Sequence, residues 1–137
     1  MKIASCIMVA RVIVPIAIAF ALTACSSSAG ISKKNPDYFG AKEREGSLSG
    51  VYNPAGFSSA QVRRLLGTLC QGGQLEGFSE ARSDGLVSWK TNCANGIRSG
   101  VGFVEFQRID GSSEIMVETT GSNGSGNLVY TRQKVKL

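Results

Sequence analysis

The chain has 137 residues, with 15 Lys and Arg against 10 Asp and Glu, four cysteines and no histidine. A net charge of +5 is too small to indicate a nucleic-acid-binding protein. The lack of histidine removes the commonest general base and the partner of most serine and cysteine nucleophiles, so we expect no enzymatic activity, no catalytic residue and no cofactor.

The first 24 residues have the pattern of a bacterial signal peptide. Lys2 and Arg11 lie near the start, and the run VIVPIAIAFALTA at 12–24 carries no charge. This run of about a dozen residues is shorter than the roughly 20 that a helix needs to cross a bilayer, and Pro15 lies within it. The pattern therefore predicts a removable leader rather than a transmembrane helix.

The leader ends in Leu22-Thr23-Ala24-Cys25, which resembles the bacterial lipobox. The resemblance implies that Cys25 is acylated and becomes the first residue of a mature protein held in the membrane by its acyl chains. Ser26 at the next position implies transport to the outer membrane, and we expect the protein to face the periplasm. Each buried methylene stabilises such an anchor by about 0.8 kcal/mol, so several chains hold it durably. The alternative is an ordinary secretory leader that ends near a cysteine by chance.

Residues 25–50 are rich in serine, glycine and charge, with few side chains suited to a core. This composition predicts a flexible, lipidated tether, followed by one small domain at 51–137. Leu48, Val51 and Tyr52 could add a short strand to that domain. The cations of the tether either contact anionic lipid headgroups or merely keep the segment soluble: Lys33, Lys34, Lys42 and Arg44.

The clearest predicted helix lies in FSSAQVRRLLGTLC at 57–70. Ser58 is followed three residues later by Gln61, the arrangement of a capping box, and Gly72 with Gly73 would stop the helix. Apolar residues recur at intervals of three and four, which places them on one face of the helix: Val62, Leu65, Leu66 and Leu69.

Two of the four cysteines are predicted to form a disulfide. Cys6 lies in the leader and Cys25 is assigned to lipid, which leaves Cys70 and Cys93 as a pair in an oxidising compartment. The 22 residues between them do not fit a Cys-x-x-Cys redox centre. Two thiols without histidine supply only half of a zinc site, so we expect no metal.

After Gly73 the sequence changes to short segments rich in Val, Ile, Phe and Thr, separated by glycine-containing turns. Successive hairpins of this kind predict an antiparallel meander of four or five strands. Val87, Trp89 and Thr91 share one face of their strand, and the leucines of the helix would cover that face. The predicted class is α+β, with one N-terminal amphipathic helix packed on the sheet. The predicted strands are 74–82, 86–93, 100–109, 114–120 and 128–136.

The last predicted strand places a tyrosine and three cations on one face, which we call the basic stripe: Tyr130, Arg132, Lys134 and Lys136. The basic stripe could bind an anionic partner such as lipid headgroups, an acidic glycan or an acidic protein surface. Alternatively, lysines on a terminal strand protect a sheet edge from unwanted pairing. The loop before it, GSNGSGN at 121–127, lacks the Lys-Ser/Thr ending and following helix of a phosphate-binding loop, so we expect a mobile hairpin loop.

Residues 58–68, SSAQVRRLLGT, resemble the helix motif of the SmpA/OmlA family, small outer-membrane lipoproteins that assist the assembly of barrel proteins. The resemblance implies an anchored chain with helical segments and a small antiparallel sheet. Three functions follow from the sequence. The favoured one is a non-catalytic, lipid-anchored envelope protein that binds another envelope component. The alternatives are a periplasmic inhibitor or ligand-binding module that uses the exposed sheet face, and an SmpA/OmlA-like assembly factor.

Overall fold

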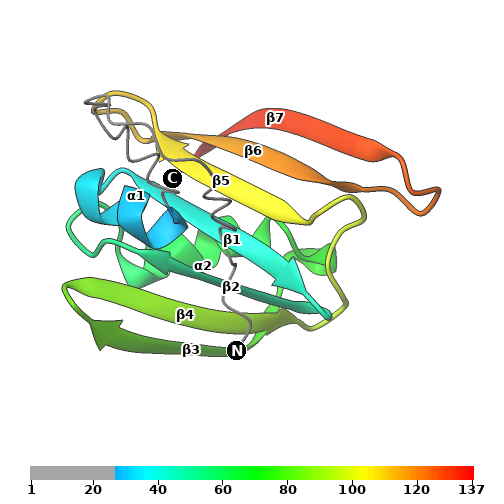
Figure 1. Cartoon of the computed structure of the whole chain (residues 1–137), viewed down its shortest axis with the longest axis horizontal. Helices are drawn as coiled ribbons and strands as arrows, with labels where there is room; N and C mark the ends of the chain where they lie inside the picture. Colours follow the sequence, from blue (N-terminus) through cyan, green and yellow to red (C-terminus); the bar gives the residue numbers. More distant parts are fainter. Residues whose placement is uncertain (1–26) are drawn as a thin grey trace, which may run out of the picture.

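The computed structural model describes residues 27–137 and shows a seven-stranded antiparallel sheet with a helix on each face (Figure 1). The predicted signal peptide and Cys25 lie outside the described residues. No helix within residues 27–137 combines the length and the apolar character that crossing a membrane requires. The elements are α1 (Ser28–Lys34), β1 (Tyr38–Arg44), β2 (Ser47–Tyr52), α2 (Ser59–Gly67), a short 3-10 helix (Gln71–Gly73), β3 (Leu75–Ser83), β4 (Leu86–Cys93), β5 (Phe103–Arg108), β6 (Glu114–Ser122) and β7 (Leu128–Lys136).

The strand order in the sheet is β3-β4-β2-β1-β5-β6-β7. The five predicted strands are all present as β3 to β7, but the β1–β2 hairpin lies between β4 and β5. β2 therefore pairs with β4, and β1 pairs with β5. The predicted simple meander of four or five strands is wrong, because the chain supplies two further strands to the centre of the sheet. The fold is mostly β, with two helices and one disulfide.

The segment predicted as a tether contributes two of the central strands. Phe39, Ala41 and Leu48 are all 0% exposed, as expected for the middle of a sheet that packs against a helix. The predicted tether at 25–50 and the predicted domain start at residue 51 are therefore wrong from α1 onward. The domain includes the whole of the described N-terminal segment.

Glycine in this segment serves close packing rather than flexibility. A Cβ on Gly50 would overlap the carbonyl oxygen of Gly40 and would lie 2.7 Å from Cζ2 of Trp89. The Trp89 ring can cover β2 only because Gly50 has no side chain, and Trp89 is buried as predicted. A composition that suggests a flexible chain thus belongs here to a tightly packed strand.

The two helices lie on opposite faces of the sheet. Within β1, Phe39 points to the side of α2, where its ring contacts Phe57 just before that helix. Gly40 points to the side of α1, because a Cβ there would lie 3.1 Å from Oγ of Ser28. Since neighbouring residues of a strand point to opposite faces, the sheet has an α1 face and an α2 face, and these names are kept below.

The core lies between α2 and the α2 face of the sheet. The predicted capping box is present, because the Gln61 N–H donates to Oγ of Ser58 at 3.2 Å and the Ser58 N–H donates to Oε1 of Gln61 at 3.0 Å. The predicted apolar face of the helix is buried, with Val62, Leu65 and Leu66 at 0% exposure. This helix prediction is confirmed, although α2 itself ends at Gly67.

The disulfide predicted between Cys70 and Cys93 is present. Cys70 follows α2 and Cys93 is the last residue of β4, so the bond joins the helical segment to the sheet. The two Cα atoms lie 5.3 Å apart, and both side chains are buried in the core.

Removal of the disulfide should destabilise the domain substantially. A closed loop of this length stabilises a fold by about 3 kcal/mol in the chain-entropy account. We therefore expect the Cys70→Ala/Cys93→Ala variant to unfold at a lower urea concentration than the wild type. The variant should not respond to reductant, whereas the wild type should lose stability when reduced. Equal unfolding midpoints for the oxidised wild type and the double variant would contradict this role.

The close packing around Gly50 predicts that a single added methyl group lowers the stability strongly. Gly50→Ala should destabilise the domain by about 1 to 3 kcal/mol, the usual range for overpacking a tight core. Gly124→Ala is the matched control, because a Cβ at Gly124 meets no atom within 4 Å, and surface changes of this kind stay within about 0.5 kcal/mol. Urea unfolding of both variants measures the difference, and equal stabilities would show that the sheet tolerates the added methyl group.

Candidate functional site

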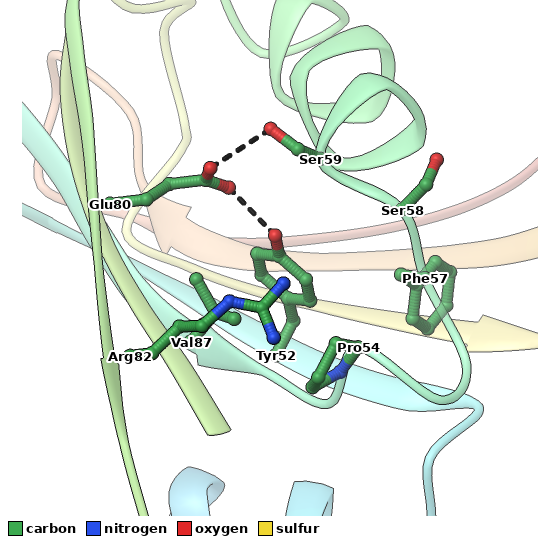
Figure 2. Close-up of a pocket in the computed structure, with 8 residues that line it drawn as sticks. All are labelled: Tyr52, Pro54, Phe57, Ser58, Ser59, Glu80, Arg82 and Val87. Atoms are coloured by element: carbon green, nitrogen blue, oxygen red, sulfur yellow. Dashed lines mark hydrogen bonds between the residues drawn. The ribbon is translucent and has the colours of Figure 1, made fainter. Parts of the chain in front are cut away.

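A polar pocket opens beside the start of α2, on the α2 face of the sheet (Figure 2). Its volume is about 530 Å³. The walls come from the end of β2, the loop before α2, the first residue of the helix, and strands β3 and β4. The lining residues are Tyr52, Pro54, Phe57, Ser58, Ser59, Glu80, Arg82 and Val87.

Glu80 is the centre of the hydrogen bonds in this pocket. Figure 2 shows its carboxylate reaching from β3 toward the first turn of α2 and toward β2. The Tyr52 hydroxyl donates to Oε1 at 2.7 Å, and the Ser59 hydroxyl donates to Oε2 at 3.0 Å. A negative charge is also favourable beside the N-terminus of a helix. Glu80 therefore holds the edge strand β3 against β2 and α2.

Burial, and then the hydrogen bond to Glu80, raise the pKa of Tyr52 to about 12. At neutral pH the tyrosine is thus a proton donor to Glu80 and not a base or a nucleophile. The serine hydroxyls are also engaged, Ser58 as the cap of α2 and Ser59 at Glu80. The arrangement stabilises the fold and provides no activated nucleophile.

A second buried tyrosine on the opposite face has the same environment. The Tyr38 hydroxyl donates to Oε1 of Glu105 at 3.0 Å. Burial, followed by this hydrogen bond, raises the pKa of Tyr38 to about 12. Two tyrosine–glutamate pairs therefore join strands across the sheet, one on each face.

These two pairs predict a loss of stability at alkaline pH. A raised pKa means that the folded chain keeps a proton that the unfolded chain loses near pH 10. The stabilisation is complete below pH 10 and disappears as the pH rises from 10 to 12. The free energy of unfolding should fall by about 1 to 3 kcal/mol for each tyrosine over this range. Denaturant unfolding at several pH values measures the slope.

Variants assign this loss to the two buried hydroxyls. Tyr52→Phe should remove about half of the alkaline loss, and Tyr38→Phe/Tyr52→Phe most of it. Tyr130→Phe changes an exposed tyrosine and serves as the matched control, which should behave like the wild type. A double variant with the full alkaline loss would exclude these pairs as its cause.

The basic stripe lies on the edge strand β7, at the end of the sheet farthest from β3. Tyr130 is 57% exposed, and the three cations are exposed as well. Nε of Arg132 donates to Oε1 of Glu118 on β6 at 2.7 Å, while Lys134 and Lys136 form no ion pair with another described residue. The four side chains of the basic stripe are therefore accessible to a partner, and Thr131 and Gln133 between them are exposed as well.

The strand register places the basic stripe and α1 on the same side of the molecule. Lys42 lies opposite Phe103, Phe103 opposite Thr120, and Thr120 opposite Tyr130. Residues that lie directly opposite each other point to the same face of a sheet. Lys42 is two residues from Gly40, which points to α1, so the side chains of the basic stripe project from the α1 face.

One exposed side chain of this surface was not singled out by the sequence. Leu128, the first residue of β7, is 81% exposed, and it precedes Tyr130 by two residues on the α1 face. The sequence did indicate this position, because Leu128 continues the two-residue spacing that predicted the basic stripe. The α1 face therefore combines cations with two exposed large hydrophobic residues.

The loop predicted to join the last two strands does connect β6 to β7. Its backbone is held by Asn123, whose Oδ1 accepts from the N–H groups of Ser125 and Asn127 at 3.0 Å each. Within residues 27–137, no group of three or more cysteines or carboxylates lies close enough to hold a metal ion.

Comparison with known proteins gives no match: no family model fits the chain, and neither a curated protein nor a solved structure is significantly similar to it. The resemblance of residues 58–68 to the SmpA/OmlA motif thus stays a prediction.

Proposed function

We propose that the protein is a lipid-anchored lipoprotein of the bacterial cell envelope, with a binding role and no catalytic one. The observation that carries the proposal is Leu22-Thr23-Ala24-Cys25 at the end of a charge-free leader. The acyl chains on Cys25 hold the protein at the outer membrane, facing the periplasm. The Cys70–Cys93 disulfide supports an oxidising compartment such as the periplasm.

The binding role is supported by how the polar groups of the domain are used. In the pocket beside α2, each hydroxyl and the carboxylate take part in hydrogen bonds that hold the fold. The basic stripe, in contrast, leaves Lys134 and Lys136 exposed on a sheet edge. An anionic envelope component is the partner whose charge complements this surface.

The test is the intact mass of the protein extracted from membranes with detergent. The mature chain should begin at Cys25 and carry acyl groups, and Cys25→Ala should abolish both the acylation and the membrane retention. Cys6→Ala is the matched control, because that cysteine lies within the leader, and its mature mass should equal that of the wild type. An unacylated mature wild-type chain would exclude the anchor.

A further inference from the structure

The fold leaves almost no spacer between the proposed anchor and the domain. α1 begins at Ser28, so only Ser26 and Ser27 separate it from Cys25. Three peptide steps span at most about 10 Å. A domain anchored at Cys25 therefore lies against the lipid headgroups and cannot extend far from them.

Polar contacts fix α1 on the sheet and thereby set which side of the domain is near the anchor. Ser32 is 0% exposed, and its hydroxyl donates to the Ser28 carbonyl at 3.0 Å and to the Val51 carbonyl at 3.4 Å. Nδ2 of Asn53 donates to the Ser32 carbonyl at 3.1 Å. Nζ of Lys33 pairs with Asp84 at 2.8 Å. Because α1 is held on the α1 face, this face is turned toward the membrane.

The same face carries side chains that suit a lipid surface. Leu128 and Tyr130 are the exposed large hydrophobic residues of the described chain, and both project from the α1 face of β7. Tyrosine is favoured at membrane interfaces because its ring is apolar and its hydroxyl is polar. The cations Arg132, Lys134 and Lys136 follow them at every second position.

Two of the acidic groups on this face are engaged by side chains of the same face, while exposed Glu76 lies opposite Asn92 at the β3 side of the sheet, far from the basic stripe, and forms no ion pair with another described residue. Glu105 accepts a hydrogen bond from Tyr38, and Glu118 is paired with Arg132. Glu114 lies opposite Lys136 in the register without forming an ion pair with it. Lys42 on β1 and Lys90 on β4 add two exposed cations to the same face.

We propose that the α1 face docks on an anionic phospholipid bilayer, with Leu128 and Tyr130 inserted at the headgroup boundary and Lys134 and Lys136 on lipid phosphates. The orientation rests on the proposed anchor at Cys25. A bilayer fits better than a protein partner because the anchor already holds this face at the lipid, at a high effective concentration. Weak contacts of single side chains then suffice to orient the domain.

The experiment uses the full acylated protein, reconstituted into vesicles of neutral phosphatidylcholine or of phosphatidylcholine with phosphatidylglycerol. Tyr130→Trp places a fluorescent reporter in the docking surface, and Leu128→Trp is a second reporter. Ala60→Trp, at an exposed position of α2, is the matched control on the opposite face. Lipids brominated on the acyl chain quench a tryptophan that enters the bilayer, and buried Trp89 gives the same background in all three variants.

Docking predicts quenching of the reporters at 128 and 130 in anionic vesicles, and no quenching of the reporter at 60. The effect should fall at high salt, because exposed charges are screened. Each lysine near an anionic surface accounts for about a fivefold change in the docking equilibrium constant, so Lys134→Glu/Lys136→Glu should lower that constant by about 30-fold or more. Arg63→Glu/Arg64→Glu, the same charge change on α2, should leave the quenching unchanged.

Several outcomes would overturn the docking. One is equal quenching at positions 60 and 130 in vesicles that carry the acylated protein. Another is quenching that the lysine variant does not reduce. A shift in the emission of the tryptophan at 130 in native membranes, together with no quenching by brominated lipid in anionic vesicles, would assign the α1 face to a membrane protein and not to lipid. The intact mass decides separately whether the anchor exists, so a failure of docking and a failure of anchoring are distinguishable.

Discussion

The packing of Phe39 between two other aromatic rings is the contact on which the rest of the structure depends. Its ring stacks on Phe106 with 4.4 Å between centroids and meets Phe57 edge-on at 4.9 Å. These three residues come from β1, β5 and the loop before α2, so one cluster joins the two halves of the sheet to the helix. Fully buried aromatic and aliphatic side chains each contribute about 1.5 to 3 kcal/mol. The cluster thus holds β1 at the centre of the sheet through side-chain packing, in addition to its backbone pairing with β2 and β5.

The parts of the fold that the sequence predicted are those with a local pattern. α2 has a capping box and a leucine face, and β4 was predicted with the bounds that the structure has, because Val87, Trp89 and Thr91 alternate with polar residues. β1 was missed because it lies in a segment rich in serine, glycine and charge. β2 was predicted only as a short strand that Leu48, Val51 and Tyr52 could add, since one of its core-facing positions is Gly50, where the Trp89 ring replaces a side chain. α1 was missed because it is attached to the sheet through Ser32, a buried serine that no hydrophobic pattern indicates.

The candidate site also has parts that the sequence predicted and parts that it could not predict. The basic stripe could be predicted because successive side chains of a strand point to opposite faces, and only Leu128 was overlooked. The pocket beside α2 could not be predicted, because Glu80 and Tyr52 come together only when β4 lies between β3 and β2. The face of the sheet from which the basic stripe projects could not be predicted either, since the position of α1 relative to β7 depends on the strand order. Features within a single strand could therefore be predicted from the sequence, whereas contacts between residues far apart in the chain could be identified only from the fold.

The central position of the β1–β2 hairpin also affects the order in which the chain can fold. β1 is among the first strands to be synthesised, yet its partner β5 follows much later, with Phe39 opposite Phe106. Until β5 arrives, one edge of β1 has unpaired backbone groups, and such edges are where chains aggregate. Pairings between distant segments are also slow to form. A chain with this topology therefore gains from being kept unfolded by a chaperone until its last strands are available.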